Sequence, residues 1–237
     1  MVYASFLLIA LLYASVGQAG ASGYIAVMAL LEFAPESIKP TALVLNALVS
    51  LLVTWRFMRS GRVDWKLLWP FALAAVPMAL LGGALTLPVL WFDWLLGSLL
   101  VVAGIPFFLK KPNEESIKPP RVAAALLVGS VIGVLSGLTG VGGGVLITPL
   151  LIYCRWASVK TAAAISAPFI LLNSLAALAG HWGSTSQLPE NVWVLAMIAL
   201  LGALIGSHLG TKFLPTNAVQ KILGAILLMS GLKLLLG

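Results

Sequence analysis

The chain has 237 residues, of which 61% are hydrophobic and only 9% charged, and its net charge is +7. Because a soluble domain is typically about one quarter charged, this composition excludes an ordinary soluble enzyme and indicates an integral membrane protein. The basic residues stand at the ends of apolar segments, as in the cytoplasmic loops of membrane proteins, so nucleic-acid binding is not expected. A single cysteine and two histidines give no basis for a disulfide framework, a metal site or a cofactor.

Six segments are predicted to cross the bilayer, because each approaches the roughly 20 apolar residues that a helical span needs. They are residues 41–57, 67–87, 91–109, 159–179, 192–209 and 218–236. Two further apolar stretches, 2–33 and 122–153, are interrupted near the middle by glycine clusters. Their halves of roughly 12 to 15 residues are too short to span alone, so each stretch is predicted to form a broken helix or a re-entrant hairpin.

The polar segment 110–121 divides the chain almost in half, and we expect it to be a cytoplasmic linker between two membrane repeats, 1–109 and 122–237. Each half contains a GxxGxxG triplet followed by a similar Ser-x-Lys segment. The matching positions are Gly17, Gly20, Gly23 and Lys39 in the first half and Gly137, Gly140, Gly143 and Lys160 in the second. Several matches in the same order predict an internal duplication.

The distribution of Lys and Arg predicts the topology, since short loops rich in these residues stay in the cytoplasm. Loop 56–66 and the linker are basic, whereas loop 88–93 has no Lys or Arg. The second half obeys the same rule only if 122–153 returns to the cytoplasm as a hairpin. Each half then has one broken hairpin and three spans, and this odd number of crossings inverts one half relative to the other, as in many secondary transporters. The predicted fold is an all-α polytopic membrane protein of two inverted repeats, with both chain ends outside.

The most informative motif is SGLTGVGGGVLITP at residues 136–149. Each glycine in a helix costs about 1 kcal/mol relative to alanine, so this glycine cluster predicts a break in the helix. Backbone that unwinds inside a membrane must line a cavity or be buried in protein. The N–H groups at the start of the following half-helix favour anions, and glycine lets a ligand approach the backbone closely. We therefore predict a small anion site between this break and its counterpart in the first half.

The candidate substrate-binding residues lie in the two breaks and on the helices that follow them. They are Gly17, Gln18, Gly20, Ser22, Gly23, Asn46, Thr139, Gly140, Gly142, Gly143, Gly144, Ser166 and Asn173. Ser50 and Ser174 are further polar candidates on the same helices. The expected partners are the small anion, the lipid bilayer of the inner cell membrane and, for coupling, protons, while a homodimer is left open.

Other interpretations of these features remain open from the sequence. Glycines in membrane helices also serve close helix packing, and buried amides and hydroxyls also join helices. A passive anion channel would have similar features. An intramembrane serine protease of rhomboid type would use Ser22, in a GxSG motif, with His208 as its base.

The glycine motifs resemble those of the sulfite exporter TauE/SafE family, also called the TSUP permeases. The segments that carry the resemblance are 17–31, 39–48, 136–151 and 159–180, so it covers nearly the whole chain. The positions that match the family motif are Gly137, Gly140, Gly142, Gly143, Gly144 and Pro149. The first copy departs from the motif at Ser22 and Tyr24. The resemblance implies a permease for sulfur-containing anions such as sulfite, thiosulfate or organosulfonates.

Overall fold

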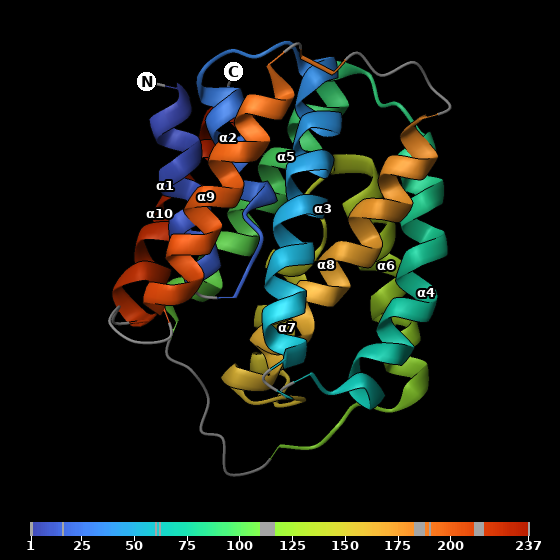
Figure 1. The fold of residues 1–237 in the computed structure, drawn as a ribbon. Helices are drawn as coiled ribbons and strands as arrows, with labels where there is room; N and C mark the ends of the chain where they lie inside the picture. The colour runs from blue at the N-terminus through green and yellow to red at the C-terminus, as the bar shows by residue number, and fades with distance from the viewer. Residues whose placement is uncertain are drawn as a thin grey trace.

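The computed structural model describes residues 2–15, 17–59, 61, 63–109, 117–182, 188–189, 191–210 and 216–236. This part of the chain is helical and contains no strand, which confirms the predicted all-α class (Figure 1). In chain order the helices are α1 (Val2–Ser15), α2 (Ala21–Leu30), α3 (Pro35–Arg59), α4 (Trp65–Ala84), α5 (Val89–Gly104), the 3-10 helix η1 (Ile105–Phe108), α6 (Val122–Thr139), α7 (Gly144–Tyr153), α8 (Val159–Trp182), α9 (Val192–Gly210) and α10 (Thr216–Leu236).

Five helices among the described residues are long and apolar enough to cross a membrane: α3, α4, α5 with η1, α6 and α8. The predicted spans at 192–209 and 218–236 are also helices, α9 and α10, although they are not among these five. Helix α3 begins earlier than the predicted span, at Pro35, because proline is well tolerated in the first turn of a helix. The extra turn brings Lys39 into the helix.

Helix α6 corrects one expectation, because its 18 residues are long enough to cross by themselves. Its first glycines do not unwind the helix but pack against the backbone of α4, where a Cβ atom would overlap a carbonyl oxygen. They are Gly129, Gly133 and Gly137, which face the carbonyl oxygens of Phe71, Ala75 and Ala79. For these glycines the close-packing interpretation holds.

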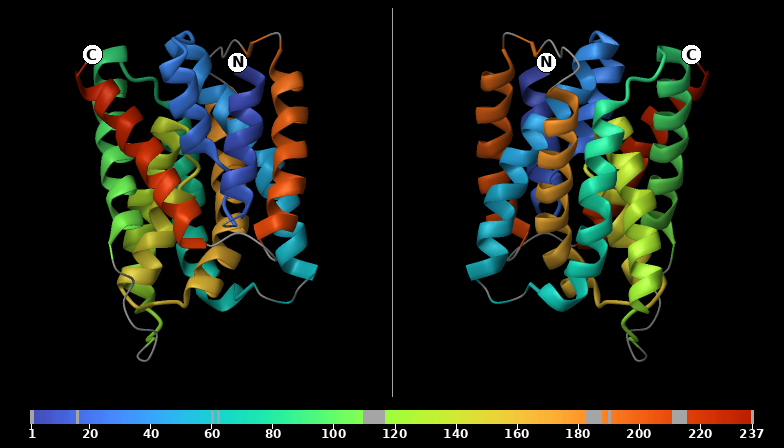
Figure 2. Two further views of the ribbon diagram at one scale, coloured as in Figure 1. Left: turned by 90° about the vertical axis from the view of Figure 1, so that its left-hand side faces the viewer. Right: turned by 90° about the vertical axis from the view of Figure 1, so that its right-hand side faces the viewer.

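The two interrupted stretches form hairpins that open toward opposite ends of the molecule (Figures 1 and 2). Helix α1 starts at the end that carries both chain termini, and α2 returns to that end. Helix α6 starts at the opposite end, and a backbone hydrogen bond of 2.9 Å from Lys118 N to Arg155 O joins its approach to the end of α7. The helices α1, α2 and α7, with 14, 10 and 10 residues, are too short to span alone.

The helices pair in a pattern that relates the two halves of the chain. Helix α1 packs against α9 and α4 against α6, while α3 crosses α8 and α5 lies beside α10. If each of α1–α5 is replaced by its counterpart in α6–α10, and the reverse, the same pairs result. The pair α1–α9 becomes α6–α4, while α3–α8 and α5–α10 are unchanged. This is what two related repeats would produce, and the duplication itself stays a prediction.

The outer surface of the helix bundle is strongly apolar. Large side chains such as Trp69, Leu127 and Met197 are each about two thirds exposed, at 65%, 69% and 66%. Such a surface is unfavourable in water and suits the acyl chains of a bilayer. The fold is therefore that of a multi-pass membrane protein.

Candidate substrate-binding site

The first break connects α1, which ends at Ser15, to α2, which begins at Ala21. Its backbone is left-handed at Gly17 and Gly20, with φ of 80° and 98°, a conformation that glycine adopts without a steric penalty. Gly20 is the N-cap of α2, and no side chain of its own caps the helix. The first N–H groups of α2 are therefore open to acceptors from elsewhere in the protein.

The second break connects α6 to α7 and contains three left-handed residues. Gly140, Gly142 and Gly143 have φ of 81°, 75° and 78°. Any other residue would be strained at each of these positions, by about 1–2 kcal/mol. This explains why the glycine cluster ends the helix at Thr139, whereas the earlier glycines of α6 leave the helix intact.

Asn46 of α3 connects both breaks. Its side chain is buried, and its Oδ1 accepts a hydrogen bond from the Ala21 N–H, the first residue of α2, at 3.2 Å. Its Nδ2 donates to Ser174 Oγ of α8 at 2.9 Å. The backbone of Gly142 lies so close that a Cβ atom there would overlap Asn46 Nδ2. One amide therefore contacts the start of α2, the second break and α8.

Hydroxyl groups surround the first break. Tyr13 Oη and Ser22 Oγ lie 2.9 Å apart in the protein interior. The ring of Tyr24 stacks on Phe6, with 5.5 Å between ring centroids, and its hydroxyl lies against Gly20. This hydroxyl is fully buried and has no hydrogen-bond partner within the described part of the chain. Neither tyrosine was predicted as a site residue, since an isolated tyrosine in an apolar helix carries no pattern of its own and Tyr24 stood out only as a departure from the family motif.

Lys39 is a further residue that sequence reasoning missed. It looks like a lysine at the end of a span, but its side chain is only 6% exposed. Its Nζ donates to the carbonyl oxygens of Gly83 and Leu85, each at 3.0 Å, and to that of Gly82 at 3.4 Å. The sequence misleads here, because Pro40 favours a helix start directly after Lys39, whereas the helix begins at Pro35.

The comparison with known families decides what kind of protein this is. The profile of the family described as sulfite exporter TauE/SafE matches residues 2–234. The chain belongs to the sulfite exporter TauE/SafE family. It is similar to the probable membrane transporter protein y4hK of Sinorhizobium fredii, with 42% identity over an alignment that covers 98% of this chain and 96% of the relative. It is also 29% identical to the probable membrane transporter protein YjnA of Bacillus subtilis, with 92% of each chain covered. No solved structure matches the chain.

Membership of the TauE/SafE family makes the chain a membrane transporter and not an enzyme. The protease interpretation of Ser22 and His208 is therefore wrong. In the structure the Ser22 hydroxyl pairs with that of Tyr13. The GxSG motif around it belongs to the turn that starts α2.

The remaining polar candidates of this TauE/SafE protein have mostly local partners. Thr139 Oγ1 donates to Leu135 O at 2.6 Å, and Ser166 Oγ lies 2.6 Å from Thr148 Oγ1 of α7. Asn173 Nδ2 donates to Phe169 O at 2.9 Å. The Asn173 Oδ1 is buried without a hydrogen-bond partner in the portion of the chain that the structure describes. Gln18 is buried in the first break.

Three of the candidate glycines have side-chain neighbours that leave no room for a Cβ atom, and one of them, Gly143, is also left-handed. A Cβ atom at Gly23 would lie 2.6 Å from Ile9 Cγ2, and one at Gly143 would lie 2.9 Å from both Ile132 Cγ2 and Phe169 Cε1. At Gly144 it would overlap Ile170. These positions keep the hairpins close to their neighbours, and a role in substrate binding is a proposal at each of them.

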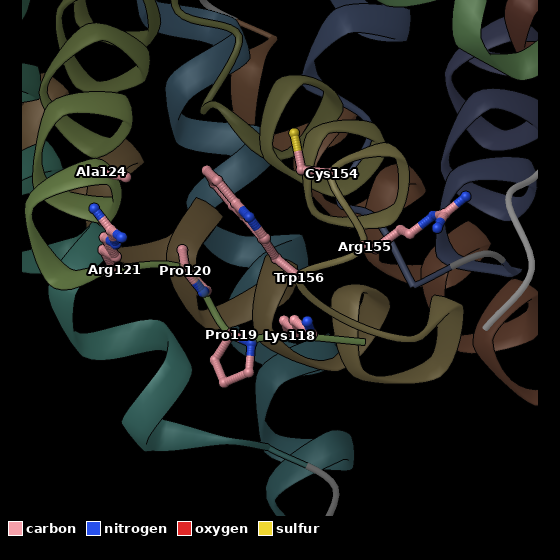
Figure 3. A pocket seen from close by; sticks show the side chains of 8 residues that line it. All are labelled: Lys118, Pro119, Pro120, Arg121, Ala124, Cys154, Arg155 and Trp156. Carbon is pink, nitrogen blue, oxygen red and sulfur yellow. The ribbon is translucent and has the colours of Figure 1, made fainter. Parts of the chain in front are cut away.

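A separate open pocket of about 530 Å³ lies where the α6–α7 hairpin opens (Figure 3). It is lined by Lys118, Pro119, Pro120, Arg121, Ala124, Cys154, Arg155 and Trp156. None of the predicted site residues lines it. Basic side chains such as these are typical of cytoplasmic loops.

Proposed function

We propose that this TauE/SafE membrane protein is a secondary transporter of a small sulfur-containing anion, such as sulfite, thiosulfate or an organosulfonate, in the inner cell membrane. The anion binds near the middle of the molecule, between the two glycine breaks. The family description supports the substrate class. The contacts of the two breaks support the location.

The position of Asn46 carries the proposal. Its Oδ1 accepts a hydrogen bond from the N–H at the start of α2, which is the kind of donor that binds anions at helix N-termini. Its Nδ2 lies beside the left-handed backbone of Gly142. An anion that displaces the Asn46 carbonyl from Ala21 can accept hydrogen bonds from both the N–H and the amide. It would then contact both hairpins at once, as alternating access requires of a substrate between two repeats.

The donors near the breaks are neutral and suit an anion whose charge is spread over several oxygens. The hydroxyls of Tyr13, Ser22 and Tyr24 stand next to the first N–H groups of α2. Hydrogen bonds to an ionised acceptor are about twice as strong as those between neutral groups.

Coupling to protons is the second part of the proposal. The acidic residues that the structure describes are Glu32, Glu36, Asp64 and Asp93, which lie in or near the end turns of helices. None of these four belongs to the breaks. We infer that a coupled proton travels on the anion itself when the anion is a weak base such as sulfite, because thiosulfate and sulfonates stay ionised at neutral pH.

The test is uptake into liposomes that contain the purified protein. The anions are sulfite, thiosulfate, sulfate, taurine, sulfoacetate and acetate, each with and without an inward proton gradient. We expect saturable uptake of at least one sulfur anion, enhanced by the gradient, and none in empty liposomes. Uptake that rises without saturation would instead indicate a passive anion channel, and no uptake by folded protein would contradict the sulfur-anion proposal.

A further inference from the structure

Lys39 is a buried cation whose ammonium donates to three backbone carbonyls. Its three acceptors, Gly82, Gly83 and Leu85, lie at the C-terminal end of α4. No carboxylate pairs with it among the residues that the structure describes. The carbonyl dipoles at a helix C-terminus amount to roughly half a negative charge, so they offset the ammonium only in part.

Burying the charge of Lys39 therefore lowers the stability of the fold. Taking an ammonium group out of water carries a large desolvation penalty, and an ionisable residue inside a membrane helix usually has a functional role. A neutral amide such as glutamine could donate to the same carbonyls at lower cost. The end of α4 alone does not explain why the residue is charged.

Lys39 also forms part of the surroundings of the second break. A Cβ atom at Gly140, the residue that ends α6, would lie 3.1 Å from Lys39 O and 3.3 Å from its Cα and Cγ. His181 of α8 also lies near Lys39, and a positive charge on its ring would repel the ammonium. The carbonyls at the end of α4 therefore hold the ammonium, beside the turn at Gly140. This place lies in the first turns of α3, toward the end of the molecule that carries both termini (Figure 1).

Two other lysines show that neither sequence position nor capping chemistry alone produces this burial. Lys160 is the counterpart of Lys39 in the second half of the chain, and it is exposed. Lys233 donates to the carbonyls of Ala29 and Leu30 at the end of α2, each at 3.3 Å, and it is also exposed. Only Lys39 of these three combines burial with contact to a glycine break.

We propose that Lys39 is the fixed positive charge that makes the transport pathway selective for anions. This inference rests on the proposed function, because it assigns a specificity-determining residue to the same site. The ammonium attracts a small oxyanion that approaches the second break from the end with the termini. The neutral donors around Asn46 then bind the anion at the breaks. The ligand class is a monovalent or divalent oxyanion, and the ammonium attracts the divalent one more strongly.

The charge dependence gives a test that a structural lysine would not pass. Coulomb energy scales with the product of the charges, so loss of the ammonium should weaken a divalent anion about twice as much, in free energy, as a monovalent one. If the dissociation constant of a monovalent anion rises about tenfold, that of a divalent anion should rise about a hundredfold. A variant that merely loosens the fold would weaken both by the same factor.

The experiment compares Lys39→Gln and Lys39→Arg with the matched controls Lys160→Gln and Lys233→Gln. The full-length protein is purified in detergent, and apparent dissociation constants are obtained from its thermal stabilisation by thiosulfate, which is divalent, and methanesulfonate, which is monovalent. Gln keeps an N–H donor for the α4 carbonyls but removes the charge, and Arg keeps the charge. We expect the unequal loss in Lys39→Gln alone, with Arg and both controls close to the wild-type protein.

The failures of the two proposals are distinguishable. Wild-type protein that neither anion stabilises, and that takes up no anion in liposomes, would overturn the proposed function and this inference with it. Wild-type protein that binds both anions, with Lys39→Gln losing neither or losing both equally, would overturn only the role of Lys39. A Lys39→Gln protein that does not fold would also overturn it, since the lysine would then be structural.

Discussion

At the residue scale, the polar groups near the two breaks are held by a small number of specific contacts. Asn46 uses both ends of its amide, on Ala21 and Ser174. The Tyr24 hydroxyl and Asn173 Oδ1 are buried without partners in the described part of the chain. Buried polar atoms are costly unless they are hydrogen-bonded, so the Tyr24 hydroxyl, which lies against Gly20 of the first break, is a donor available to an anion.

Replacing Asn46 with alanine should reduce transport at least about tenfold and destabilise the protein by about 1–3 kcal/mol, because the Ala21 N–H and the Ser174 hydroxyl lose their partner. The measurement is initial uptake rate in liposomes together with the unfolding temperature. Ser37→Ala is the control, since Ser37 lies in the first turn of the same helix and its hydroxyl donates to Ala34 O, at 2.8 Å. Normal uptake by a folded Asn46→Ala protein would contradict the proposed site.

Gly142→Ala should be more damaging than Gly61→Ala, although both glycines are left-handed, with φ of 75° and 65°. At Gly61 a Cβ atom meets nothing within 4 Å, so only the backbone strain of about 1–2 kcal/mol remains. At Gly142 the Cβ atom would also displace the Asn46 amide. Unfolding temperatures and uptake rates of the two variants provide the comparison. Equal losses in both would show that the contact with Asn46 has no consequence.

At the element scale, glycines serve two different purposes in this protein. Along α6 they let the backbone approach α4, and at the end of α6 they provide the left-handed turns of the break. The spacing of the residues does not distinguish these roles. What distinguishes them is whether a neighbouring helix backbone lies against the glycine, and that is known only from the packing.

Gly133→Ala should separate α4 from α6, because its Cβ atom would overlap the Ala75 carbonyl oxygen, and backbone cannot move aside as a side chain can. Overpacking of this kind typically costs about 1–3 kcal/mol. The expected result is a lower unfolding temperature in detergent. Ala123→Leu is the control, since it adds a larger group at an exposed position of the same helix. A larger loss in the control would contradict the packing argument.

At the scale of the whole molecule, two hairpins open to opposite ends (Figure 2). The helix pairs of one half correspond to those of the other half. Basic residues such as Lys118, Arg121 and Arg155 gather at the end where the α6–α7 hairpin opens (Figure 3). By the positive-inside rule this end faces the cytoplasm and the chain termini face the outside. The topology is a prediction that a single cysteine makes simple to test.

Cys154 should react with a membrane-impermeant maleimide only from the cytoplasmic side, because it is the sole cysteine of the chain and is exposed beside Arg155 and Trp156. Intact cells should leave it unlabelled, and inverted membrane vesicles should label it. The reference is Glu36→Cys in a Cys154→Ser background, since Glu36 is exposed at the start of α3 and should show the opposite pattern. Labelling of Cys154 in intact cells would reverse the topology.

Local chemistry was enough to predict a helical membrane protein and the place of both helix breaks. Apolar length sets the spans, and the dense glycines at Gly140, Gly142 and Gly143 cannot continue a helix at low cost. Those properties belong to the segment itself, so they can be inferred without its neighbours. The same local reasoning underestimated the length of α6, because the effect of an isolated glycine depends on what packs against it.

The contacts between segments were decided only by the tertiary structure. Nothing near Asn46 in the chain indicates that it touches Ala21 and Ser174, and Lys39 looks like its exposed counterpart Lys160. Burial and hydrogen bonding depend on how distant helices cross, which is fixed by the packing of α3, α4, α6 and α8. Helix formation is governed by neighbours in sequence, whereas a binding site is assembled from residues that only folding brings together.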